Sequence, residues 1–277
     1  MNKNIILYAL FLVLCVQPTK AYSVFDFGYS DLENANPTQL VYNIGVYSFL
    51  GILQYLLVSA IFEWKNPMPK NKLRMENIKR EIKYGTTQIF LQVAYSMIFY
   101  HYVYPYCQWY RYYTINSYGL LNFGYGMVFL YIWTTVLGYW VHRIFHFRFL
   151  YKHVHSVHHS FREPTAFGYC ATHPLEGISE VNTVLHLAEL IIPIHPLMTL
   201  FFFEYITVNE MMGHDGGEYD HSDHYRHHLY YVVNYGDTIM DEFFGTVYNS
   251  KNYPIKAKCT YVESIEDRTE AIFMKYK

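Results

Sequence analysis

The stretch YGLLNFGYGMVFLYIWTTVLGYWVHRIFH, residues 118–146, joins a long apolar segment directly to a pair of histidines. Residues 118–141 contain no Asp, Glu, Lys or Arg, and as a helix they are long enough to cross a hydrocarbon core of ~30 Å. His142 and His146 follow at once. Because they are four residues apart, they share one face of a helix. The stretch therefore predicts a membrane helix that carries two imidazoles at its end.

Two more histidine clusters follow this stretch. Fourteen of the fifteen histidines lie between His142 and His228, and H-x-x-H-H occurs at 155–159 and again at 224–228. In such a unit we expect the first two histidines to share a helix face and the third to point about 100° away from the second. One unit then reaches two metals. Eight rings are too many for one tetrahedral site, so the clusters predict a dinuclear metal centre.

The predicted ligands are nine histidines: His142, His146, His155, His158, His159, His214, His224, His227 and His228. Three further candidates are His221, which ligates or orients a ligand, Glu218, a carboxylate four residues after His214, and His173. We expect His173 to support a ligand or to begin a helix rather than to bind the metal. The remaining histidines, namely His101, His153, His186 and His195, are expected to be structural or interfacial.

The ligand types narrow the metal without choosing it. Imidazole suits iron, zinc and copper alike, and thiolates are missing from the clusters. The four cysteines show no C-x-x-C spacing, which indicates neither a disulfide framework nor a thiolate zinc site. Two metals bound by nitrogen ligands alone, in a membrane protein, favour iron that reacts with dioxygen. The alternative, a hydrolase with two zinc ions, would more often use bridging carboxylate ligands, which the clusters lack.

Composition supports the membrane setting. Of the 277 residues, 52% are hydrophobic, 20% are aromatic and only 16% are charged, against roughly 25% charged in soluble domains. A surplus of rings with polar tips is typical of membrane interfaces. The net charge of −2 offers no field for nucleic acid.

Further apolar segments complete the predicted spans. Residues 40–62 and 87–106 are each long enough to cross, with a buried core helix as the alternative interpretation. Residues 176–213 predict a helical hairpin that turns at Pro193 and Pro196. Its polar members His186, Glu189 and Glu204 are costly in lipid, so we expect them to face protein or a polar cavity.

Charge predicts the orientation. The segment between the first two spans, 64–85, is rich in Lys and Arg, and the positive-inside rule places it in the cytoplasm. The third span then delivers His142 to the cytoplasm. Residues 1–21 are interpreted as a signal peptide or an uncleaved N-terminal anchor.

Together these features predict an all-α integral membrane protein with about four to five transmembrane helices, hairpin included, and a cytoplasmic histidine-rich dimetal cap. The expected organisation is a membrane-spanning region at 22–141, a histidine-box catalytic domain at 142–247 and a cytoplasmic tail at 248–277.

At these residues the chain resembles the membrane fatty acid hydroxylase/sterol desaturase superfamily, and most closely its sterol C-5 desaturase branch. The resemblance runs from about Gly138 to Val247. It rests on segments that follow the order of that branch: LYKHVHSVHHSFREPTAF (150–167), THPLEG (172–177), IIPIH (191–195), GHDG (213–216), HHLYYVVNYG (227–236) and DEFFG (241–245). The signal-like N-terminus and the bulky Tyr225 and Arg226 inside the last box depart from it.

The resemblance implies a multi-pass enzyme of the endoplasmic reticulum membrane with two iron ions. It implies a membrane lipid substrate, most simply a sterol, and desaturation by O₂. Electrons would come from NAD(P)H through a cytochrome-b-type haem protein and its reductase. Phe167, Tyr169 and Phe201–Phe203 are candidates to line a lateral path for the lipid, and lipid-facing aromatics are the equal alternative.

Two alternatives stay open on the sequence. The first alternative is a hydroxylase of the same superfamily and fold, which would act on a sterol or on a fatty-acyl or alkyl-lipid chain. A metal-binding transporter or an inactive scaffold belongs to a different class; a transporter needs ionisable residues along several spans, and the first three spans lack charged residues.

Overall fold

The computed structural model describes residues 36–66, 70, 72–106, 115–194, 196–217, 222–249 and 251–252. Every regular element within these ranges is helical, which confirms the predicted all-α class. The predicted signal peptide or anchor and most of the predicted tail lie outside the described residues.

Four long helices and a set of short ones make up the fold. The long helices are α3 (Pro37–Lys65), α4 (Lys72–Tyr102), α5 (Ile115–Phe145) and α9 (Pro196–Asp215). The short elements are η1 (Tyr104–Tyr106), α6 (Arg148–Leu150), η2 (Tyr151–His155), η3 (His158–Ser160), η4 (Gly168–Cys170), α7 (Pro174–Gly177), η5 (Ile178–Thr183), α8 (Val184–Ile191), α10 (His224–Tyr230) and α11 (Thr238–Phe244).

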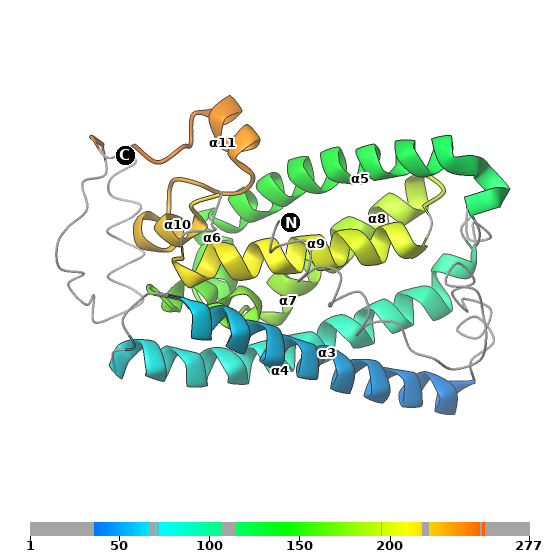
Figure 1. Cartoon of the computed structure of the whole chain (residues 1–277), viewed down its shortest axis with the longest axis horizontal. Helices are drawn as coiled ribbons and strands as arrows, with labels where there is room; N and C mark the ends of the chain where they lie inside the picture. The colour runs from blue at the N-terminus through cyan, green and yellow to red at the C-terminus, as the bar shows by residue number, and fades with distance from the viewer. Residues whose placement is uncertain are drawn as a thin grey trace.

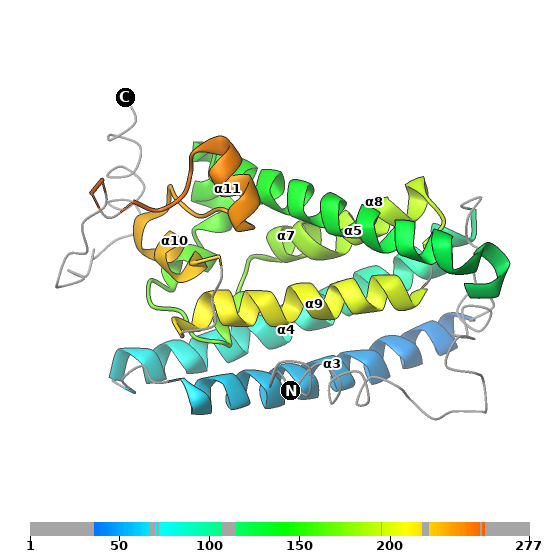
Figure 2. The same cartoon turned by 45° about the horizontal axis from the view of Figure 1, so that its top comes forward.

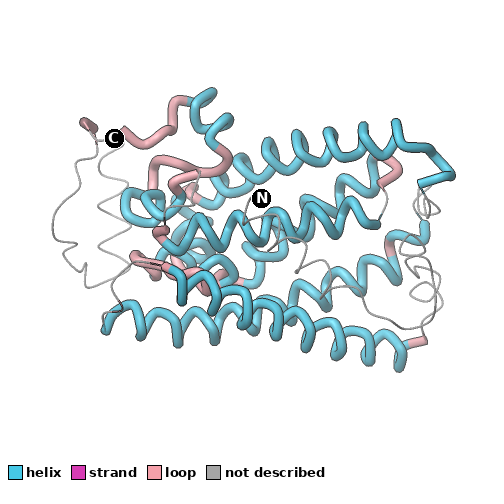
Figure 3. Tube along the Cα trace, viewed as in Figure 1, coloured by secondary structure: helices cyan, strands magenta, loops and turns pink. Residues whose placement is uncertain are grey.

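The long helices run along the long axis of the molecule, with α3, α5 and α9 pointing one way and α4 the other (Figures 1 and 2). As a result the C-terminal ends of α3, α5 and α9 and the N-terminal end of α4 lie at one end, beside α10 and α11. Most of the described loops gather at this same end (Figure 3). It is referred to below as the histidine end.

Two described helices are long and apolar enough to cross a membrane: α3, and α5 from Leu120 to Phe145. Only 22% of the residues in the apolar part of α3 and 11% in that of α5 are buried. Large apolar side chains such as Phe49 and Leu121 point outward and are 66% and 78% exposed. Such faces suit a hydrocarbon environment, and these helices contain the predicted spans at 40–62 and 118–141.

Helix α4 differs from the sequence prediction. The predicted basic loop at 64–85 is too long, because α4 already begins at Lys72. Its buried face includes polar side chains at helical spacing, namely Arg74, Asn77, Glu81, Gln88 and Gln92. Hydropathy alone misses such a helix, since the stripe that packs inward is polar. The predicted span at 87–106 is its C-terminal part together with η1.

The predicted hairpin is present as α8 and α9, and the chain turns between Ile191 and Pro196. The first arm is not one helix, because α7 and the π-helical η5 precede the eight-residue α8. A shared apolar core joins the hairpin to α5 and consists of Leu130, Leu185, Ala188, Ile194, Met198 and Phe202. At Gly126, α5 lies close to α9, because a Cβ atom at this position would lie 2.7 Å from the Met198 sulfur.

The ionisable residues of the hairpin face protein, as predicted. Glu189 is 1% exposed and accepts hydrogen bonds from the hydroxyls of Tyr100, at 2.9 Å, and Thr199, at 2.7 Å. His186 lies 3.1 Å from Glu189 and stacks on Phe99 at a ring distance of 4.2 Å. These contacts tie α4, α8 and α9 together, because a buried carboxyl group needs such partners.

The histidine end is also held by a buried ion pair. The Arg74 guanidinium donates to both carboxylate oxygens of Glu63, at 2.7 and 2.6 Å, and to the carbonyl of Asp215 at 3.0 Å. The Asn66 amide donates to the same carbonyl at 2.7 Å. The start of α4 and the end of α3 thus bind the last turn of α9 at Asp215, the residue after His214.

Candidate metal centre

The nine histidines predicted as ligands come from separate elements and meet at the histidine end. His142 lies in the last turn of α5, His146 follows its last residue directly, and His214 lies in the last turn of α9. The remaining six lie on η2, η3 and α10: His155, His158, His159, His224, His227 and His228. They form two groups, and within each group the candidate ligand atoms lie within 4.8 Å of one another.

Each H-x-x-H-H unit serves both groups, but not with the predicted pairing. In α10 the first and third histidines, His224 and His228, join one group while the second, His227, joins the other. Around the axis of an α-helix, the side chains of residues four apart differ in direction by about 40° and those of residues three apart by about 60°. The first and third histidines, four apart, therefore point in the more similar directions. The unit at 155–159 divides in the same way, with its middle histidine in the opposite group. The expectation that the first two histidines face the same way and the third points elsewhere was therefore wrong, since the first and third are grouped together.

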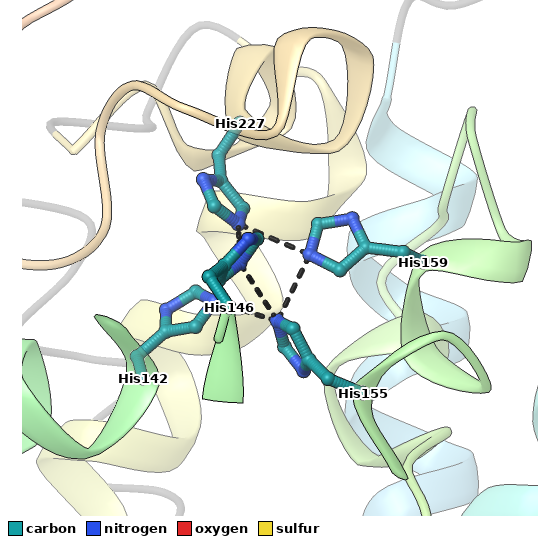
Figure 4. Close-up of side chains that lie close together, drawn as sticks. All are labelled: His142, His146, His155, His159 and His227. Carbon is teal, nitrogen blue, oxygen red and sulfur yellow. Dashed lines mark hydrogen bonds between the residues drawn. The ribbon is translucent and has the colours of Figure 1, made fainter. Parts of the chain in front are cut away.

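The first histidine group comprises His142, His146, His155, His159 and His227, whose rings point toward one another (Figure 4). The Nε2 atom of His155 lies 3.1 Å from that of His142, 2.9 Å from that of His146 and 3.0 Å from that of His159. The Nε2 atom of His227 lies 3.0 Å from His146 Nε2 and 3.1 Å from His159 Nε2.

The second histidine group comprises His158, His214, His224 and His228, all of them buried. The Nε2 atoms of His158 and His214 are 3.1 Å apart. Because both groups draw on the same two H-x-x-H-H units, they are adjacent.

One short loop fixes the direction of three rings. The Nδ1 atoms of His227, His224 and His142 lie 2.7, 3.3 and 2.7 Å from the carbonyl oxygens of residues 233, 234 and 235 in turn. A carbonyl oxygen only accepts, so each Nδ1 carries the proton and each Nε2 keeps a lone pair. The Nδ1 of His228 faces the Phe161 carbonyl in the same manner, at 3.0 Å.

That loop is itself held in an uncommon conformation. Tyr231 and Asn234 have φ of 66° and 52°, in the left-handed region. The Asp241 carboxylate accepts from the backbone N–H groups of Tyr235, at 2.9 Å, and Gly236, at 3.0 Å. Strained backbone stays in place only where its surroundings over-determine it, and it concentrates at functional sites.

A metal ion fits this donor arrangement. Lone pairs on nitrogens about 3 Å apart repel one another, and imidazoles whose protons sit on Nδ1 have none left to place between the Nε2 atoms. A cation between them turns the repulsion into ligation. Either group offers nitrogen donors alone, a set that suits iron, zinc or copper.

Burial keeps the rings in the form a metal requires. Desolvation, and next the neighbouring His224, lower the pKa of His158 to about 3. Desolvation likewise lowers the pKa of His224 to about 4. The pKa values of His155, His159, His227 and His228 are well below the usual range for the same first cause, with added repulsion from neighbouring rings. At neutral pH the rings are therefore uncharged and free to bind a cation.

The other predicted site residues lie elsewhere. His173 begins α7, where its ring nitrogen accepts from the Leu175 N–H at 3.2 Å, and it joins neither group. His221 and Glu218 lie outside the described residues. Of the suggested path aromatics, Phe167 and Tyr169 pack around Tyr55 of α3, whereas Phe202 sits in the α5–hairpin core and Phe201 is partly exposed.

Sequence reasoning missed two acidic residues beside the first group. Glu176 and Glu180, from α7 and η5, place carboxyl oxygens within 4.8 Å of each other and of a His155 nitrogen. The segment THPLEG that contains Glu176 stands out in the sequence only through its resemblance to the family. The sequence did offer one signal for Glu176: it is an acidic residue two positions after Pro174, which starts a helix, and it lies close to the histidine boxes.

Comparison with known proteins agrees with this geometry. The fatty acid hydroxylase family profile matches residues 127–246, which contain all nine histidines. Human lathosterol oxidase is 25% identical over 247 residues, which cover 82% of this chain and 80% of that protein. The Delta(7)-sterol 5(6)-desaturase of Eremothecium gossypii is 27% identical over 248 residues, covering 82% of this chain and 70% of that protein.

A shorter match of higher identity is to the Delta(7)-sterol 5(6)-desaturase of Leptosphaeria maculans. It is 32% identical over 123 residues, which cover 41% of this chain and 34% of that protein. No solved structure matches the chain. These relatives confirm the resemblance to the sterol C-5 desaturases.

Proposed function

We propose, on the premise that this chain belongs with the sterol C-5 desaturases of the fatty acid hydroxylase family, that it is a membrane-bound iron oxidoreductase that uses O₂ to introduce a double bond into a sterol. The observation that carries the proposal is the pair of adjacent histidine groups with converging Nε2 lone pairs.

The nine histidines are the proposed ligands of two iron ions, one ion for each group. When bound, the ions supply the redox chemistry by which O₂ removes hydrogen from an unactivated carbon. Forming one C=C bond while one O₂ becomes two waters takes up two electrons and two protons. We assign the electrons to NAD(P)H by way of a cytochrome-b-type haem protein and its reductase.

The charge at the histidine end supports a proposed orientation of the protein in the membrane. The basic residues Lys65, Lys70 and Lys72 lie where α3 ends and α4 begins, and this junction contacts the last turn of α9. By the positive-inside rule that end is cytoplasmic. We therefore propose a multi-pass protein of the endoplasmic reticulum membrane, with the metal centre at its cytoplasmic face. The bilayer would hold α3, the part of α4 from residue 87 onward, α5 and the α8–α9 hairpin.

The test is O₂-dependent conversion of a Δ7 sterol by the detergent-purified, iron-loaded protein supplied with reductant and electron carrier. A product with one additional ring double bond supports the proposal. An alcohol product moves the chain to the hydroxylases of the same family. No conversion and no O₂ uptake with iron bound would overturn the proposed oxidase function and leave a metal-binding scaffold.

A further inference from the structure

The side of His155 that faces away from the first group meets a carboxyl group. Its Nδ1 lies 2.9 Å from Oε1 of Glu176, and both side chains are fully buried. The rings of His142, His224 and His227 meet backbone carbonyls at the same position. His155 is therefore distinguished from them by the chemistry of its outer partner.

Glu176 has little else to satisfy it. Neither of its oxygens makes an aligned hydrogen bond within the described residues, and neither does Nδ1 of His155, so the 2.9 Å approach is a close contact between two otherwise unsatisfied buried groups. A buried carboxyl group without partners is costly. Its placement beside His155, which also lies 2.9 to 3.1 Å from three other Nε2 atoms, therefore calls for a reason other than packing.

The surroundings hold Glu176 in place. Gly177 lets α7 approach α4 closely, because a Cβ there would lie 2.3 Å from Nε2 of Gln88 and 2.7 Å from Oγ1 of Thr172. The π-helical η5 follows at once and brings Glu180 to the same position. Single π-helical turns are frequent at functional sites.

We propose that Glu176 is a positioning residue that keeps the proton of His155 on Nδ1 and so directs its Nε2 lone pair to the ion of the first group. The inference rests on the proposed metal centre and adds to it a residue outside the nine ligands. A carboxyl group behind a ligating imidazole fixes the ring and makes it a stronger donor, and its loss typically weakens metal binding by about 10–100-fold.

The test compares Fe²⁺ binding to wild type and to Glu176→Gln, by anaerobic titration and by iron content after dialysis against a chelator. Gln matches Glu in shape but presents an amide that also donates, so it does not hold the Nδ1 proton reliably. We expect one of the two ions in Glu176→Gln to bind about 10–100-fold more weakly and to be lost on dialysis, while the ion of the second group stays.

The matched control is Glu189→Gln, which changes a carboxyl group that is just as buried but bonded to Tyr100 and Thr199. It should retain both ions. Equal affinity and two ions in both wild type and Glu176→Gln would overturn this inference and leave the proposed function intact. Three ions in wild type and two in Glu176→Gln would make Glu176 a ligand of a third site, which also overturns the positioning role. No iron in wild type would overturn both proposals.

Discussion

Ring orientation at single histidines decides what the histidine end can bind. The carbonyls of residues 233–235 accept hydrogen bonds from the Nδ1–H groups of three rings, which leaves the Nε2 lone pairs of these rings directed inward. Asp241 binds the N–H groups of the two peptide units that contain the carbonyls of residues 234 and 235, and so holds this loop. The match of the segment at 241–245 to the family thus has a physical basis: the aspartate shapes the loop that orients the ligands.

Removing one ligand from either group should abolish turnover. His158→Ala takes a nitrogen from the second group and His227→Ala takes one from the first. Each should also lower the iron content by about one ion per chain. His153→Ala is the matched control, because His153 is exposed within the same histidine box and, among the ring pairs described, its ring contacts only that of Phe149, at a tilt. Full activity in either ligand variant would refute the assignment.

A buried acid outside the metal centre should make stability depend on pH. Burial raises the pKa of Glu81 to about 8, against hydrogen bonds from Thr165 that lower it. In the unfolded chain the Glu81 carboxyl group has its ordinary pKa of 4.5. The contribution of its raised pKa to the free energy of unfolding is therefore fully present below pH 4.5. It is lost as the pH rises toward 8, by about 1.4 kcal/mol per pH unit.

Glu81→Gln should flatten that dependence. Thermal midpoints of wild type and variant, measured from pH 5.5 to 8, isolate the contribution of Glu81 as their difference. We expect the wild-type midpoint to fall more steeply with pH than that of the variant. Parallel curves would show that Glu81 ionises normally in the folded protein.

At the residue scale, the sequence indicated which histidines come together, while their binding of metal stays a prediction. All nine predicted histidines do converge in two groups, because repeated imidazoles at helical spacing rarely serve packing alone. The pairing within each unit and the role of Glu176 were not predictable. Both depend on π-helical and 3-10 turns and on contacts between segments distant in sequence.

At the scale of elements, α4 marks the limit of hydropathy. Apolar runs identified α3, α5 and the hairpin turn, since lipid-facing helices must be apolar on their outer surface. The first half of α4 carries charge outside and polar groups inside, so its sequence resembles a loop. Its polar stripe packs against η4 and the loop before it, where Thr165 donates to Glu81.

Weakening the ion pair at the start of α4 should loosen the end of α9. Glu63→Gln removes the carboxylate that pairs with the buried Arg74 guanidinium, and breaking one side of a buried pair costs about 3–5 kcal/mol. We expect a lower thermal midpoint and weaker iron binding in the second histidine group, because Asp215 follows His214.

The control for that change is Lys72→Gln. Its ion pair with Glu76 spans 3.8 Å and Lys72 is 91% exposed, so little stability depends on it. Equal thermal midpoints and iron contents for Glu63→Gln and wild type would show that the buried pair does not hold α9.

For the whole molecule, polarity along the long axis is the main feature. Most of the described loops lie at one end, and the apolar helices extend to the other (Figures 1 and 3). The basic junction of α3 and α4 and both histidine groups belong to the loop-rich end. The sequence anticipated this asymmetry because charge and histidine clusters fall between apolar segments. The number of membrane crossings depends on how α4 and the hairpin sit in lipid, which hydropathy does not decide.

Orientation can be tested with single cysteines in a background where Cys15, Cys107 and Cys259 are serine. In sealed microsomes, an impermeant thiol reagent should label Lys79→Cys, near the histidine end, from the cytoplasmic side. Tyr106→Cys, 88% exposed at the other end, should react only after permeabilisation. The reverse pattern would place the metal centre in the lumen.

The central claim is that the two histidine groups hold two iron ions that react with O₂. The most direct measurement is the iron and zinc content per chain of anaerobically reconstituted protein, together with O₂ uptake after reduction. Two irons per chain and O₂ uptake that disappears in His158→Ala and His227→Ala are the predicted result. One metal per chain, or zinc alone with no O₂ consumed after reconstitution with iron, would contradict the claim.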